Sequence, residues 1–190
     1  MTSAPLFRAQ LSGRAEIDLE IRRAEIGLFR NEGATFTAGI WLEATQPGMT
    51  LDDRGDKNWD APVALDLNLG EIGTPDASGA FAPKRREQAV SPTPDDGFFY
   101  YWDHTAFVAL DWHLTTSGAG QFHINMTCKS AEGHSVTCAT EMRGMTVHLA
   151  HFTPTDRALL PVLFARSVEE IKVKRQSSGA LLARWPEPPR

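Results

Sequence analysis

All six histidines fall in the second half of the chain. His113 and His123 lie in two stretches where apolar and polar residues alternate, so each is expected to project from the polar side of a β-strand. A glycine-rich turn between the stretches would pair the strands and bring Asp111 and Asn125 to the same face. An aspartate beside two histidines can hold a divalent transition metal, or orient an imidazole for proton transfer.

The alternative interpretation of this polar face is that it is the solvent side of a half-buried sheet, which is polar in any case. The spacing of His148 and His151 does not strengthen the metal hypothesis, because residues three apart on a strand point to opposite faces. We expect no cofactor. If a metal binds at all, its ligands are predicted to be Asp111, His113 and His123.

Two features of the sequence could supply a nucleophile, but both are weak signals. Residues 133–137 begin like a Gly-x-Ser-x-Gly elbow, but Thr137 stands in place of the last glycine and the segment reads as a β-turn. Cys128 and Cys138 occupy alternating apolar positions, which favours buried structural thiols over reactive ones. The sequence therefore names no catalytic residue.

An aromatic run, Phe98 to Trp102, is the second candidate site. On a strand, either Phe98, Tyr100 and Trp102 or Phe99 and Tyr101 must face outward. Tyrosine and tryptophan are favoured anchors at interfaces, so Tyr100, Tyr101 and Trp102 are candidate binding residues. The alternative is a central strand that is covered on both sides.

Alternating apolar residues predict the strands that must position these side chains. A hairpin is predicted around Asn31-Glu32-Gly33, because glycine there suits the left-handed conformation of a tight turn. Strands are expected over 16–22, 26–29, 35–43 and 63–69, then a four-stranded meander over 105–116, 121–129, 136–140 and 145–149. A helix is predicted at about 155–167, and a last hairpin from 171–175 and 180–185.

Residues 74–97 contain several prolines and few aliphatic side chains, which predicts a long surface loop without regular elements. Loops of this length tend to be functional, and this one could serve as a contact arm. Its middle carries Lys84-Arg85-Arg86, the most concentrated basic patch in the chain. The tail, 186–190, is expected to fray.

Composition bounds the function classes. A chain of 190 residues with 23% charged residues fits one globular domain. The net charge of -5 argues against general nucleic-acid binding and against a membrane surface. No signal-peptide pattern is visible, so a cytoplasmic location is expected. The excess of arginine over lysine hints at a bacterial or phage source.

The sequence therefore predicts a single mainly β domain, an antiparallel sandwich or barrel-like sheet with one helix in the C-terminal half. An α+β fold with a single sheet is the alternative. The leading functional hypothesis is a non-enzymatic protein-interaction or binding domain, such as an accessory subunit or an immunity-like protein, whose partner is another protein. Two alternatives stay open: a small metal-assisted or acid–base enzyme on the histidine face, and a β-barrel that binds a small apolar ligand. The sequence does not predict an oligomeric state.

Overall fold

The computed structural model describes residues 6–31, 35–45, 63–87, 90–101, 103–118, 120–149, 154–166, 170–176 and 181–184. Strands dominate this part of the chain and one α-helix follows late, which confirms the mainly β prediction. The strands are β1 (Leu6–Gln10), β2 (Glu16–Asp18), β3 (Glu20–Arg30), β4 (Phe36–Thr45), β5 (Val63–Gly73), β6 (Lys84–Arg86), β7 (Gly97–Tyr101), β8 (Asp103–Gly118), β9 (Gln121–Ser130), β10 (Ser135–Glu141), β11 (Gly144–Leu149), β12 (Lys172–Arg175) and β13 (Leu181–Arg184). The helices are α1 (Pro154–Phe164) and the short 3-10 turn η1 (Pro94–Asp96).

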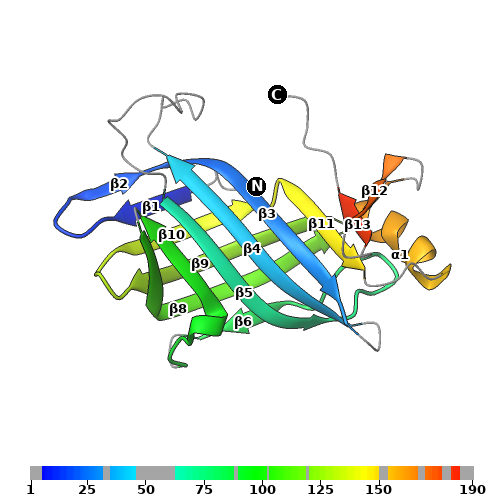
Figure 1. Cartoon of the computed structure of the whole chain (residues 1–190), viewed down its shortest axis with the longest axis horizontal. Coiled ribbons are helices and arrows are strands. Elements are labelled where there is room, and N and C mark those ends of the chain that lie inside the picture. The colour runs from blue at the N-terminus through cyan, green and yellow to red at the C-terminus, as the bar shows by residue number, and fades with distance from the viewer. Residues whose placement is uncertain are drawn as a thin grey trace.

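The strands form one open sheet that curls into a half-barrel. Its order is β12-β13-β11-β3-β4-β5-β7-β8-β9-β10-β1-β2, with β6 also paired to β8. In Figure 1, β3, β4 and β5 cross in front of β8, β9 and β10. The strand β7 joins these two halves, because it pairs with β5 on one side and with β8 on the other.

The inward side chains of both halves meet in one hydrophobic cluster. Leu65 and Leu67 of β5 are fully buried there, as their alternation with Asp66 and Asn68 predicted. The cluster also contains Trp112 from the opposite half of the sheet. The burial of these apolar side chains stabilises the curled sheet, by roughly 25 cal/mol for each Å² of apolar surface removed from water.

The strand β8 departs from the simple alternation of its sequence. Leu110, Trp112 and Leu114 are buried, but Val108, which continues their two-residue spacing, is 53% exposed. The register of β8 with β9 shifts between Phe107 and Ala109. Such a β-bulge adds one residue and reverses the side-chain alternation beyond it, so Val108 faces outward.

The predicted four-stranded meander is wrong at its last strand. The strands β8, β9 and β10 are antiparallel neighbours, but β11 pairs in parallel with β3 and antiparallel with β13. Arg143 directs this crossing, because its backbone N–H donates to the Ala24 carbonyl at 2.7 Å and its Nη1 donates to the Ile21 carbonyl at 3.1 Å. The predicted C-terminal hairpin is present as β12 and β13.

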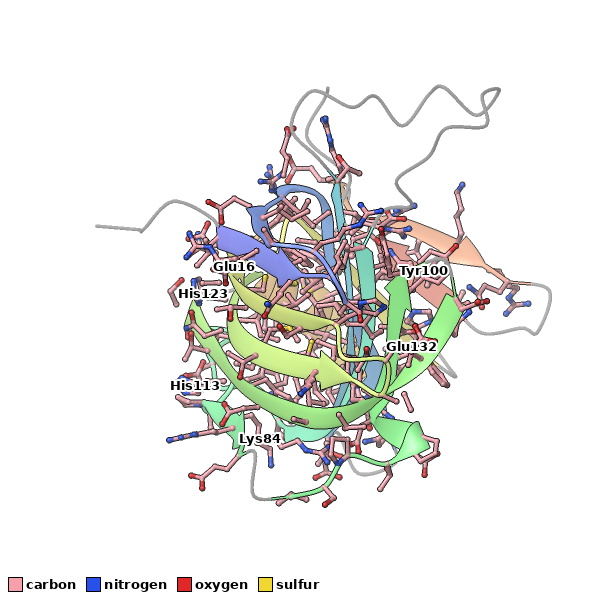
Figure 2. All side chains as sticks on the ribbon, turned by 90° about the vertical axis from the view of Figure 1, so that its left-hand side faces the viewer. Glu16, Lys84, Tyr100, His113, His123 and Glu132 are labelled. Carbon is pink, nitrogen blue, oxygen red and sulfur yellow. The ribbon has the colours of Figure 1, made fainter. Side chains whose placement is uncertain are left out.

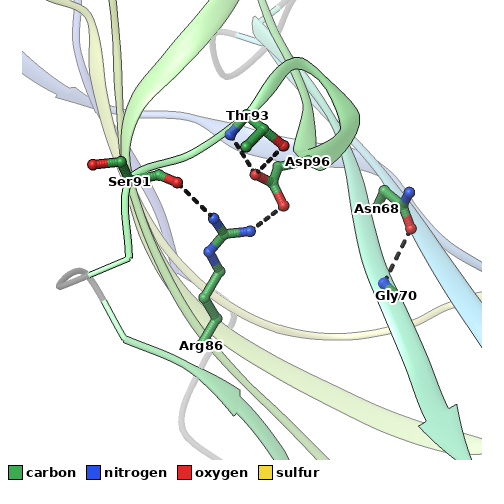
Figure 3. Close-up of polar contacts among 6 residues, drawn as sticks. All are labelled: Asn68, Gly70, Arg86, Ser91, Thr93 and Asp96. Atoms are coloured by element: carbon green, nitrogen blue, oxygen red, sulfur yellow. Dashed lines mark hydrogen bonds and ion pairs between the residues drawn. The ribbon is translucent and has the colours of Figure 1, made fainter.

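The connection from β5 to β7 contains more structure than its composition predicted. The strand β6 pairs with the edge of β8, and Arg86 at its end reaches the turn η1. There its guanidinium pairs with Asp96 and donates to the Ser91 carbonyl at 3.3 Å (Figure 3). Asp96 also accepts from the Thr93 backbone N–H at 2.5 Å. These contacts fasten the connection to the sheet.

The helix α1 ends three residues before its predicted limit, and it retains Pro161 in its interior. Leu160, Leu163 and Phe164 are buried against the core. Trp102, His151 and the tail 186–190 lie outside the described residues. Within the described ranges, no helix combines the length and the apolar character that a membrane crossing needs.

Candidate functional site

The polar histidine face forms as predicted on the outer side of β8 and β9. His113 lies opposite Asn125, and His123 lies opposite Thr115, one step further along the ladder. Asp111, two residues before His113, shares this face and is half-buried. Figure 2 shows His113 and His123 on one side of the molecule, with Tyr100 on the other.

These side chains do not assemble into a metal site. In the part of the chain that the structure describes, no three histidine, cysteine, aspartate or glutamate side chains are close enough together to hold a metal ion. Asp111, His113 and His123 therefore do not form the ligand set that the sequence allowed. The amide Nδ2 of Asn125 lies 3.4 Å from His123 Nδ1, so one imidazole contacts an amide and not a carboxylate.

A shallow hollow of about 340 Å³ borders His113 and Asp111, which we call the histidine groove. Arg85 of β6 lies opposite His113 and forms one wall. Thr127 and Thr137 of the next two strands lie across its floor. The basic patch of the long connection is thus part of this groove. Because no hydrogen bond between Asp111 and His113 is present among the described contacts, the groove offers polarity without an oriented acid–base pair.

His134 is a structural residue. It is buried, and its ring stacks on Phe99 with centroids 5.4 Å apart. Its Nδ1 accepts a hydrogen bond from the Ser12 backbone N–H at 2.9 Å. The proton of the neutral ring is therefore on Nε2, 3.2 Å from a Glu132 carboxylate oxygen. His134 joins the turn after β1 to the turn before β10.

The aromatic run faces outward through Phe98 and Tyr100. Phe98 is 40% exposed and Tyr100 is half-buried, and His104 packs against both rings, 6.0 and 5.0 Å from their centroids. Tyr101 points inward and is only 9% exposed, so its selection as a surface anchor was wrong. Its burial follows from strand parity, which sends Phe99 and Tyr101 to the core.

A larger hollow, of about 470 Å³, lies on the outer side of β3, β4, β5 and β11, with β13 at its rim. We call it the glycine groove, because Gly27 of β3 and Gly39 of β4 lie directly opposite each other at its floor. Two adjacent strands without side chains at paired positions leave a depression in the sheet. A methyl group on Gly27 would lie 3.2 Å from the Phe29 ring, which occupies part of this space.

Aromatic rings and a clamped carboxylate form the walls of the glycine groove. Phe29 stacks on His148, with ring centroids 4.2 Å apart and planes 15° from parallel. Glu25 accepts from Arg23 at 2.7 Å and from Arg184 at 3.3 Å, one guanidinium on each carboxylate oxygen. Charged groups are thus held in fixed positions beside the rings.

Two titratable groups in this groove are shifted by its walls. Burial lowers the pKa of His148, because a cation is poorly solvated there. Burial also raises the pKa of Asp66, and the nearby His104 opposes that rise. Shifted groups that gather in a concave site mark a candidate binding surface.

Sequence reasoning missed the glycine groove, although a signal was present. Gly27 and Gly39 interrupt two predicted strands of one predicted hairpin, and glycine inside a strand indicates a close approach or an open space. Phe29, Asp66 and His148 were not selected as candidate binding residues. Only the register of the two strands shows that the glycines coincide.

No known protein family, curated protein or solved structure matches this chain.

The candidate site consists of two hollows on the outer side of one curled sheet. The glycine groove is the larger, and it combines aromatic walls, a clamped ion pair and two shifted titratable groups.

Proposed function

We propose that the protein is a non-enzymatic binding protein that holds a segment of another protein in the glycine groove. The observation that carries this proposal is the hollow itself: about 470 Å³ above a pair of glycines, walled by aromatic rings. That volume falls in the range of sites that receive a side chain or small ligand. Aromatic residues around a depression are the usual anchors of protein interfaces.

The surroundings of the groove support a partner larger than a small molecule. Trp41 and Asp66 lie opposite each other at its margin, and Phe98 lies opposite Asp66 on the next strand. The outward face therefore continues from the groove to the exposed part of the aromatic run. Phe29 and Phe98 are both about two-fifths exposed, so two large apolar side chains on this outward face are accessible to a partner.

The two alternative functions have less support. An acid–base enzyme would need an oriented pair, and the histidine groove offers none among the described residues. A small apolar ligand inside the half-barrel would need space between the inner faces of β5 and β8. The side chains of those faces, including Leu65 and Leu110, are part of the packed core.

Selection from a library of displayed random peptides tests the proposal. The protein is immobilised and peptides are enriched on it, then each is measured against two variants. Gly39→Leu fills the glycine groove, and a β-carbon at this position meets only ordinary contacts, the nearest at 3.5 Å. Ala139→Leu is the matched control, because it places the same side chain in the histidine groove.

We expect enriched peptides to bind the wild-type protein and Ala139→Leu alike, and to lose at least about tenfold in affinity for Gly39→Leu, the effect of about 1.4 kcal/mol. Both variants should keep the far-ultraviolet circular dichroism of the wild type. Failure to enrich any peptide, or equal binding to Gly39→Leu, would reject the proposed function.

A further inference from the structure

The outer face holds two carboxylates in very different states on either side of Trp41. Glu25 of β3 and Asp66 of β5 both lie opposite Trp41 of β4, one on each neighbouring strand. Glu25 is paired with two guanidinium groups, whereas Asp66 has no ion-pair partner among the described residues. The sheet therefore presents one ion-paired carboxylate and one without an ion-pair partner among the described residues, on the two strands that flank Trp41.

The ion pair at Glu25 shows which side chain fits between Trp41 and a carboxylate. Arg23 lies with its guanidinium carbon 5.9 Å from the centroid of the Trp41 ring while its Nη2 bonds Glu25 at 2.7 Å. A planar guanidinium can stack on an aromatic face and pair with a carboxylate at the same time. Arginine therefore fits between Trp41 and a carboxylate in this protein's own surface.

On the other side of Trp41, Asp66 provides a carboxylate and Phe98 a second aromatic ring. Asp66 is exposed to solvent on one side and stands between Trp41 and Phe98, which are its register partners on the two neighbouring strands. Burial by its neighbours disfavours its charged form. His104 opposes this effect of burial, but its ring packs against Phe98 and Tyr100. An incoming cation would thus gain a carboxylate that has lost part of its water.

We propose that the row Trp41–Asp66–Phe98 is a docking site for an arginine side chain of the partner protein. This inference rests on the proposed function and names the chemistry of the partner, which is a segment that carries an arginine. The positive charge of that arginine is opposite in sign to the net charge of -5 of the present chain. Lysine is a weaker fit, because its compact ammonium cannot make the bidentate contact to Asp66 while it stacks on the rings.

Nuclear magnetic resonance with short peptides tests this site. The probe is an acetylated, amidated pentapeptide, Gly-Ser-Arg-Ser-Gly, and its control carries citrulline, the uncharged isostere of arginine. The reporter is the indole N–H of Trp41, whose resonance is assigned as the one lost in Trp41→Phe. We expect the arginine peptide to shift this resonance saturably in the millimolar range, about 1–20 mM for one anchored side chain. The citrulline peptide should shift it several-fold less.

The matched variants are Asp66→Asn and Glu141→Gln, which remove one negative charge each. Glu141 is exposed on β10, opposite His123 and away from the row. Asp66→Asn should lower the affinity for the arginine peptide about tenfold, as expected when the carboxylate of a charge-assisted pair is removed. Glu141→Gln should change this affinity less than about twofold.

Three outcomes would overturn the arginine assignment: no saturable shift over this concentration range, equal shifts from the citrulline peptide, or unchanged binding by Asp66→Asn. Peptides from the library selection separate this failure from failure of the proposed function. If they lose binding to Gly39→Leu but bind Asp66→Asn as well as the wild type, the groove is a binding site and its ligand is not an arginine.

Discussion

Phe29 and His148 lie face to face across two parallel strands, with ring centroids 4.2 Å apart. They are register partners on β3 and β11, and Gly27 beside them leaves room for the Phe29 ring. The stacked ring keeps water from one face of the imidazole. This burial lowers the pKa of His148 below its ordinary value of 6.5.

The first prediction concerns pH. Between the lowered pKa of folded His148 and 6.5, the unfolded chain binds more protons than the folded one, so stability rises with pH across that window. The contribution is lost on acidification and is constant above the window. In His148→Phe the stacked ring remains and the proton site is gone. We expect urea midpoints measured from about pH 7.5 to about pH 5 to fall less steeply in this variant.

An imidazole titration by nuclear magnetic resonance provides the direct check. The His148 resonance should have its midpoint below 6.5, whereas an exposed histidine in the denatured protein should titrate near that value. A midpoint at or above 6.5, or identical pH slopes for the wild type and His148→Phe, would contradict the assignment.

The second prediction concerns Arg86 and Asp96, which fasten the long connection to the sheet. Their side chains are only 15% and 16% exposed. Burial by itself would raise the pKa of Asp96, but hydrogen bonds from Arg86 and Thr93 outweigh it, and the pKa is lowered. We expect Arg86→Ala to reduce the free energy of unfolding by on the order of 2–3 kcal/mol, somewhat less than breaking a fully buried pair.

The control for this pair is Arg85→Ala. Arg85 is exposed and its Nε lies 3.7 Å from Glu87, an arrangement that contributes at most about 1 kcal/mol. In the wild type, the stability from the Asp96 carboxylate is fully present above pH 3.8 and is lost as the pH falls through the lower folded value. The stability of Asp96→Asn should lack this loss at acidic pH. Equal urea midpoints for Arg86→Ala and Arg85→Ala would refute the role of the pair.

The strands were predictable because each has one wet and one buried face. The alternation in β5 and β9 has the period of a strand and no competing helical pattern, and both strands form where predicted. The face of the sheet on which His113 lies could also be predicted, because the alternation of side chains along a strand and one tight turn nearly determine it. Fold class and the histidine face follow from such local patterns.

The bulge in β8 and the partner of β11 were not predictable from local patterns. Nothing in the residues Phe107–Ala109 marks the extra residue, which is set by the pairing of β8 with β9. The parallel pairing of β11 with β3 joins segments over a hundred residues apart, and hydrogen bonds from Arg143 direct it. The glycine groove depends on such long-range registers, so its residues could not be collected from the sequence.

The third prediction concerns Gly97, which begins β7 opposite Leu67 and precedes Phe98. A β-carbon at Gly97 would lie 1.9 Å from the Asp66 carbonyl oxygen, and the residue has a φ of 111° that side chains avoid. Gly97→Ala should therefore destabilise the protein by more than about 3 kcal/mol, since both strain and overlap must be relieved. The free energy of unfolding in urea measures this.

Gly133→Ala separates strain from overlap. Gly133 also has a positive φ, of 87°, but a β-carbon there meets nothing within 4 Å. This variant should lose only about 1 kcal/mol, the strain of a left-handed alanine. If the two variants were equally stable, the backbone of β5 would not approach Gly97 as closely as described.

The fourth prediction concerns the two cysteines, which are free and buried on neighbouring strands. Burial raises the pKa of Cys128 and of Cys138 to about 12. Because only the thiolate attacks a disulfide reagent, the folded protein should not react with an aromatic disulfide at pH 8. Addition of guanidinium chloride should release both thiols, and Cys128→Ser and Cys138→Ser should each release one. Rapid reaction of the folded wild type would contradict this prediction, because it would mean that the two strands open and expose the core around both cysteines to solvent.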